Sequence, residues 1–151
     1  VAFAEAIGLG DIDTLKKYEN KFNAVDFSKP TNNGMILMQL AVHGHQPASA
    51  EWLINHGAAY SVLDAWDLHW ENRAEQLLKE NPLLVNHLYG ETKISLLHIA
   101  AERNDIALAE LALSANPDLT IKDRVYQSTA LGWAVHLGRV EIAGLIKART
   151  I

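Results

Sequence analysis

SLLHIAAERND, residues 95–105, is the stretch of sequence that decides the fold. A second stretch, TALGWAVHLGR at residues 129–139, has the same frame and begins 34 positions later. Each begins with a hydroxyl residue, continues with leucine and alanine at helical spacing, and ends in a turn residue. The sequence therefore predicts a repeated unit whose first element is a short amphipathic helix.

A second helix completes each unit. In the copy at 95–123, the turn is predicted at Asn104-Asp105, and Asn116-Pro117 ends the second helix because proline cannot continue the hydrogen-bond ladder. In the last copy Gly138 takes the turn. The predicted apolar stripes of the two second helices are Ile106, Leu108, Ala109, Leu111 and Leu113, then Val140, Ile142, Leu145 and Ile146.

These units resemble ankyrin repeats, whose signature is T-P-L-H-x-A on a period of about 33 residues. Further copies read GMILMQLAVHGHQPASAEWLINHGAAY from Gly34, AFAEAIGLGDIDTLKKYENK from Ala2 and DAWDLHWENRAEQLLKENPLLVN from Asp64. The resemblance implies an all-α, ankyrin-like helical solenoid of about five helix-turn-helix repeats in a single domain, residues 1–151. The approximate repeats are 1–31, 32–60, 61–89, 90–123 and 124–151.

The third repeat is predicted to lack its projecting loop. The turn at His69 follows Gly57 by 12 positions, whereas Gly138 follows Asn116 by 22. Trp66 and Trp70 fall in this shortened unit and have two interpretations. They cover the apolar gap left by the missing loop, or they form an exposed aromatic patch that anchors a partner.

Composition narrows the classes of function. The 151 residues include no cysteine, which fits a cytoplasmic protein, and the net charge is −5 with 13 scattered Lys and Arg, which argues against nucleic acid as a partner. No apolar run approaches the roughly 20 residues that span a membrane. We expect a monomer. The chain starts at Val1 without Met, so a trimmed targeting segment and a fragment of a longer array, with Phe3 and Ile151 meeting further repeats, both stay open.

Motifs for chemistry are weak. His98 occupies the histidine position of the ankyrin signature, which implies structural hydrogen bonds within the repeat and its loop. His43 and His45 do not share a helical face, and neither H-E-x-x-H nor G-x-S-x-G occurs. Ser95, Ser128 and Thr129 are interpreted as helix N-caps. The sequence predicts no catalytic residue, no metal site and no cofactor.

The sequence therefore predicts a non-catalytic protein–protein interaction module or scaffold that binds an unidentified protein. The alternative is a metal or small-ligand binding protein, or an enzyme, that uses His and Trp residues of the inner surface. Ankyrin arrays bind partners on their loop tips and the ends of their first helices. Carried over by position, this implies binding through Asn32, Asn33, Met35, His43, Asp67, Glu91, Thr92, Ile94, Glu102, Arg103, Arg124, Tyr126, Gln127 and His136.

Three of these residues are the chemically favoured anchors. Tyr126, Arg103 and Arg124 carry the side chains that concentrate binding energy in interfaces. Trp133 replaces an apolar inner-helix residue and is predicted to pack in the core. For His69 and His136, partner contact and plain solvation stay equally open.

Overall fold

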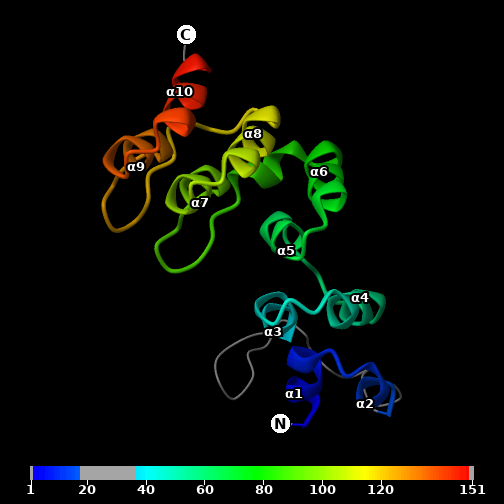
Figure 1. Cartoon of the computed structure of the whole chain (residues 1–151). Coiled ribbons are helices and arrows are strands. Elements are labelled where there is room, and N and C mark those ends of the chain that lie inside the picture. Colours follow the sequence, from blue (N-terminus) through cyan, green and yellow to red (C-terminus); the bar gives the residue numbers. More distant parts are fainter. Residues whose placement is uncertain (1, 18–36, 150–151) are drawn as a thin grey trace. The chain divides into compact units, whose positions relative to one another are not determined.

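The computed structural model describes residues 2–17 and 37–149. Within these ranges the chain is all-helical, and its only β pairing is two isolated bridges. Figure 1 labels the α-helices, which are α1 (Ala2–Leu9), α2 (Ile12–Lys17), α3 (Leu37–His43), α4 (Pro47–Asn55), α5 (Val62–Asp67), α6 (Glu71–Glu80), α7 (Leu96–Arg103), α8 (Ile106–Ser114), α9 (Ala130–His136) and α10 (Val140–Ala148). A 3₁₀ helix, η2 (Pro82–Asn86), follows α6. The all-α prediction is confirmed.

The same turn closes five successive helix pairs. In each, the backbone N–H after a left-handed residue donates to the carbonyl of a buried alanine, which is the Schellman arrangement. The left-handed residues are Gly10, His45, His69, Asn104 and Gly138, and the accepting alanines are Ala6, Ala41, Ala65, Ala100 and Ala134. Their hydrogen bonds measure 2.7 to 2.9 Å. The predicted turns at His69, Asn104-Asp105 and Gly138 are therefore confirmed.

The spacing of these alanines shows one shortened unit. They follow one another at 35, 24, 35 and 34 residues, so the unit that contains Ala65 is shorter than the others. Only residues 56–61 join α4 to α5, whereas residues 115–129 join α8 to α9. The deletion that the sequence predicted between Gly57 and His69 is thus present as a short connection.

The chain divides into two compact units, residues 1–71 and residues 72–151. In the first, α1 packs on α2 and α3, and α3 packs on α4 and α5. Its core includes Ile7, Leu15, Met38 and Leu53, each at most 1% exposed. Tyr60 and Trp70 both pack against this core. Their two rings meet each other edge to face, with centroids 6.2 Å apart. For Trp70, this contact supports the interpretation that it covers the core.

In the second unit two helix pairs stack. α7 packs on α8 and α9, and α10 packs on α8 and α9. The loops that precede α7 and α9 extend to the same side, and the Arg124 N–H joins them by donating to the Thr92 carbonyl at 2.8 Å (Figure 1). The buried apolar residues of these four helices are Leu96, Leu97, Ile99, Ala100, Ala101, Leu108, Ala109, Ala112, Leu113, Ala130, Ala134, Ile142, Ala143 and Ile146.

Four predicted stripe residues are less buried than expected, because Ile106, Leu111 and Leu145 are half-buried and Val140 is exposed. Leu111 is only half-buried, because the inner face of α8 is centred on Leu108 and Ala112. Val140 is 82% exposed, because it opens α10 roughly 200° around the helix from Ile142. Leu111 and Val140 were misplaced because the sequence has apolar residues at neighbouring helix positions, so it did not determine which side of each helix faces the core.

Candidate functional site

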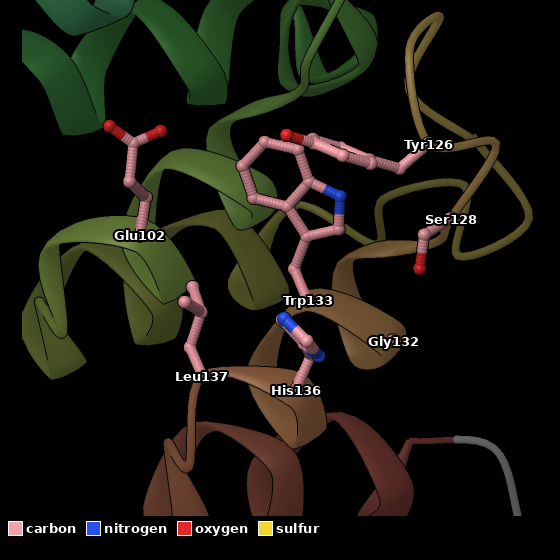
Figure 2. A pocket seen from close by; sticks show the side chains of 7 residues that line it. All are labelled: Glu102, Tyr126, Ser128, Gly132, Trp133, His136 and Leu137. Carbon is pink, nitrogen blue, oxygen red and sulfur yellow. The ribbon is translucent and has the colours of Figure 1, made fainter.

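A pocket of about 490 Å³ opens on the surface of the second unit (Figure 2). It lies where the end of α7, the loop before α9 and the outer face of α9 meet. Its lining consists of Glu102, Tyr126, Ser128, Gly132, Trp133, His136 and Leu137. In Figure 2, Glu102 and Leu137 lie on one side of the Trp133 indole, and Tyr126 and Ser128 lie on the other.

Asp123 organises the loop that forms one wall. Its side chain is fully buried, and Oδ2 accepts the backbone N–H groups of Val125 and Tyr126 at 3.0 and 2.6 Å. Oδ1 accepts the Ser128 N–H at 2.9 Å and the Trp133 indole N–H at 3.0 Å. One carboxylate therefore fixes both the loop and the indole ring of α9.

The hydrogen bonds also keep Asp123 ionised. Burial alone would raise the pKa of this carboxyl group. The donors from Tyr126, Ser128, Trp133 and Val125 outweigh that cost and lower its pKa to about 2. A buried negative charge consequently lies directly behind the pocket at neutral pH.

Tyr126 is the most exposed aromatic side chain of this wall. It is 76% exposed, although its backbone N–H is held by Asp123. Its ring meets Trp133 at an interplanar angle of 74°, with centroids 6.3 Å apart. The loop thus fixes the backbone of Tyr126 while leaving the ring open to solvent.

Trp133 forms the floor of the pocket. It is half-buried, and its inner side meets the His98 ring edge to face at 5.1 Å. The prediction that Trp133 packs in the core is therefore right for only one side of the ring. The other side lines the pocket, which the sequence analysis missed.

His98 supports Trp133 from within. Its Nε2 lies 2.9 Å from the Ser128 carbonyl oxygen, which can only accept, so Nε2 carries the hydrogen. Nδ1 then accepts from the Ser95 hydroxyl at 2.8 Å and the Ser95 N–H at 3.3 Å. Burial lowers the pKa of His98, against the raising effects of the Ser128 carbonyl and the Asp123 charge. The predicted structural role of His98 is confirmed.

Ser95 and Thr129 cap helices as predicted, but Ser128 does not. Ser95 accepts the His98 N–H in a capping box, and Thr129 accepts the Gly132 N–H at 3.1 Å. The Ser128 N–H instead donates to the Asp123 carboxylate, and the Ser128 carbonyl accepts from the Asp123 backbone N–H and from His98 Nε2. It lies one residue before the cap, so its backbone serves the loop.

Arg139 fixes the wall that carries Glu102. Its Nε donates to the Ala101 carbonyl at 2.9 Å and a terminal nitrogen donates to the Glu102 carbonyl at 3.1 Å. These carbonyls end α7, where a cation complements the helix dipole. The α9–α10 turn is thereby tied to the end of α7.

The structure brings together three of the predicted binding residues, Glu102, Tyr126 and His136. Gln127, Glu91, Thr92, Arg103 and Arg124 are exposed in the same unit, and Ile94 is half-buried, but none of the six lines the pocket. His43 and Asp67 belong to the first unit, in the last turns of α3 and α5. Asn32, Asn33 and Met35 lie outside the described residues.

Sequence reasoning also missed Asp123 and Leu137. The segment Asp123–Ser128 contains a signal that could have identified Asp123. An aspartate at the start of a loop commonly accepts the backbone N–H groups of the residues two and three positions later. Leu137 follows Trp133 by four positions, which places both on one helical face.

Residues 2–17 and 37–149 hold no group of three His, Asp or Glu side chains arranged to bind a metal ion. No helix in the same ranges is long and apolar enough to cross a membrane.

Comparison with known proteins gives a fold and no family. No family model matches the chain, and no curated protein matches it significantly. A similar solved chain comes from the structure of the predatory endopeptidase Bd0816 from Bdellovibrio bacteriovorus in complex with the immunity protein Bd3460. The TM-score is 0.59 and the identity 20%, over 97% of both chains. At that identity, the likeness establishes a shared helical fold over nearly the full length of each.

Proposed function

We propose that this chain is a non-catalytic protein-binding module with degenerate ankyrin-like repeats, and that its partner docks on the pocket of the second unit. The observation that carries the proposal is the exposed Tyr126 ring on a loop that Asp123 holds in place. A rigid loop reduces the entropy lost on binding, and exposed aromatic side chains beside a pocket are typical interface anchors.

The repeated turn supports the ankyrin-like part of the proposal. Five helix pairs closed by the same left-handed residue and the same buried alanine are what a helical repeat array requires. Ser95 and His98, which match the signature of the family, make the hydrogen bonds that the resemblance implies. The loops before α7 and α9 extend to one side, as binding loops of such arrays do.

The similar solved structure is consistent with this role. It is a complex of two proteins, an endopeptidase and an immunity protein. We carry over to this chain only the class of function, protein binding.

A matched pair of loop variants tests the proposal. Tyr126→Ala removes the exposed ring, whereas Val125→Ala shortens its exposed neighbour, which does not line the pocket. Immobilised wild-type and variant chains are incubated with lysate from the source cells, and the captured proteins are compared by quantitative mass spectrometry. We expect a protein that wild type and Val125→Ala retain and Tyr126→Ala loses. Equal retention by all three chains would rule out this pocket as the docking site.

A further inference from the structure

The pocket combines two kinds of recognition group that suit a cation. Its aromatic side chains are Trp133 in the floor and Tyr126 in the wall, and their rings stand at 74° to each other. Its acidic wall is Glu102, the one carboxylate among the lining residues. Neither the Glu102 carboxylate nor the Tyr126 hydroxyl has a hydrogen-bond or ion-pair partner among the described residues.

We infer that this pocket receives a cationic side chain, an arginine, from the partner protein, with the guanidinium group between the Trp133 face and the Glu102 carboxylate. The inference rests on the proposed protein-binding function and specifies the chemistry of the partner. Cations bind to aromatic faces because the ring quadrupole is negative there, and tryptophan is the strongest of the aromatic residues in this respect.

Asp123 strengthens the attraction from behind. Its ionised carboxylate accepts the indole N–H of Trp133 at 3.0 Å. A negative charge at the indole nitrogen increases the electron density of the ring and therefore its attraction for a cation. One carboxylate, that of Glu102, therefore lines the pocket, and a second, that of the buried Asp123, lies at the indole nitrogen of Trp133.

The neighbouring arginine side chains of this chain do not line the pocket. The Arg139 guanidinium is hydrogen-bonded to the backbone carbonyls of Ala101 and Glu102 at the end of α7. Arg103 and Arg124 carry charge on the surrounding surface without lining the pocket. The lining itself contains neither lysine nor arginine, and His136 is its only other titratable group besides Glu102 and Tyr126.

Arginine fits this arrangement better than lysine. Its planar group stacks on an aromatic ring while its N–H donors engage a carboxylate in the same plane, whereas the lysine ammonium is a more strongly hydrated point charge. The volume of about 490 Å³ leaves room for the aliphatic stem and for a neighbouring residue of the partner chain beside Leu137.

Nuclear magnetic resonance of the full chain tests the inference. The indole N–H signals of the four tryptophans are followed during titration with a capped peptide that has arginine between alanine and glycine residues. Identical peptides with citrulline or lysine at the centre separate charge and shape, and Trp133→Phe assigns the signal. Trp52, Trp66 and Trp70 lie in the first unit and serve as internal controls.

We expect the arginine peptide to shift the Trp133 signal saturably and to bind at least about fivefold more tightly than the citrulline peptide, with lysine between them. Glu102→Gln should weaken arginine binding by about two- to fivefold. The matched control, Glu110→Gln, removes an exposed charge on α8 outside the pocket and should leave the titration unchanged.

Two results would overturn the inference. Equal binding of the arginine and citrulline peptides would show that charge is not recognised, and an unchanged Trp133 signal at millimolar peptide would show that the pocket takes no such side chain. The proposed protein-binding function would survive either result if Tyr126→Ala still lost the captured partner. Conversely, arginine binding together with capture that is independent of Tyr126 would retain the cation site and reject the docking site.

Discussion

Two tyrosine–tryptophan pairs of nearly the same geometry have different surroundings in this molecule. Tyr60 and Trp70, in the first unit, meet edge to face at 6.2 Å, and Tyr126 and Trp133, in the second, meet at 6.3 Å. The first pair packs against a hydrophobic core, whereas the second borders an open pocket and Tyr126 is 76% exposed. Pair geometry therefore says little about role, and exposure separates the pair that packs on a core from the pair that we propose binds a partner.

The connecting segments explain the difference. The short connection at residues 56–61 holds Tyr60 close to the helices, so its ring is used for packing. The longer connection at residues 115–129 includes a loop that Asp123 organises with its carboxylate, so Tyr126 projects without collapsing onto the core. The five repeated turns supply the common scaffold, and the connections between helix pairs supply the variation.

The largest expected effect is a loss of stability that compares a fully buried leucine with a half-buried one in the second unit. Leu108→Ala should lower the free energy of unfolding by about 2–5 kcal/mol, because Leu108 is fully buried in α8. Leu111→Ala, on the same helix but half-buried, should cost clearly less. Urea denaturation of both variants measures the difference, and equal losses would mean that exposure does not rank these side chains.

The next prediction removes the carboxylate that holds the exposed pair, Tyr126 and Trp133, in place. Asp123→Asn should destabilise the chain by about 1–3 kcal/mol at pH 7, because an amide cannot accept all four N–H donors. Because the pKa of Asp123 falls to about 2 from 3.8, its stabilising contribution is present above about pH 4 and is lost as the pH falls towards 2.

The free energies of unfolding of wild type and Asp123→Asn should therefore converge between pH 4 and pH 2 in denaturant titrations. Glu110→Gln, an exposed substitution on α8, provides the control and should track wild type. A gap that stays constant down to pH 2 would mean that the Asp123 carboxylate contributes nothing through its charge.

The direct test of the comparison exchanges each tyrosine for alanine. Tyr60→Ala should lower the free energy of unfolding by about 1–2 kcal/mol, because it removes a half-buried ring and its contact with Trp70. Tyr126→Ala should change it by no more than about 0.5 kcal/mol, as an exposed substitution does. Thermal and chemical denaturation measure both, and a larger loss for Tyr126 would reverse the assignment of the two pairs.

The last expected effect concerns affinity for the partner. With a captured partner, Tyr126→Ala should weaken binding by somewhat more than about 1 kcal/mol, measured by calorimetry. The melting temperature should stay unchanged. Normal binding by Tyr126→Ala, with binding abolished by Trp66→Ala or Trp70→Ala, would move the docking site to the shortened unit.

The sequence predicted the helix pairs well and the pocket incompletely. Local signals define a pair: Asn104 and Gly138 favour the left-handed turn, and Ser95 and Thr129 cap the helices that follow. Those signals depend on neighbours within a few positions. The shortened third unit was also readable, because a missing loop changes the number of residues between two turns.

The pocket depends on contacts between segments, which periodicity does not describe. Glu102 and Trp133 lie 31 positions apart and line one pocket because α7 packs on α9. The partial burial of Trp133 likewise follows from His98 and Asp123 on neighbouring segments. Residue type alone therefore favoured Arg103 and Arg124 as anchors, although neither lines the pocket.

Site-specific photocrosslinking gives the most direct test of the central claim that the partner docks at the pocket of the second unit. A photoreactive phenylalanine derivative replaces Tyr126 in one chain and Leu83, which is 75% exposed in η2 and does not line the pocket, in another. After irradiation in lysate, we predict one crosslinked protein from position 126 and its absence from position 83. The same product from both positions, or no product from position 126, would contradict the claim.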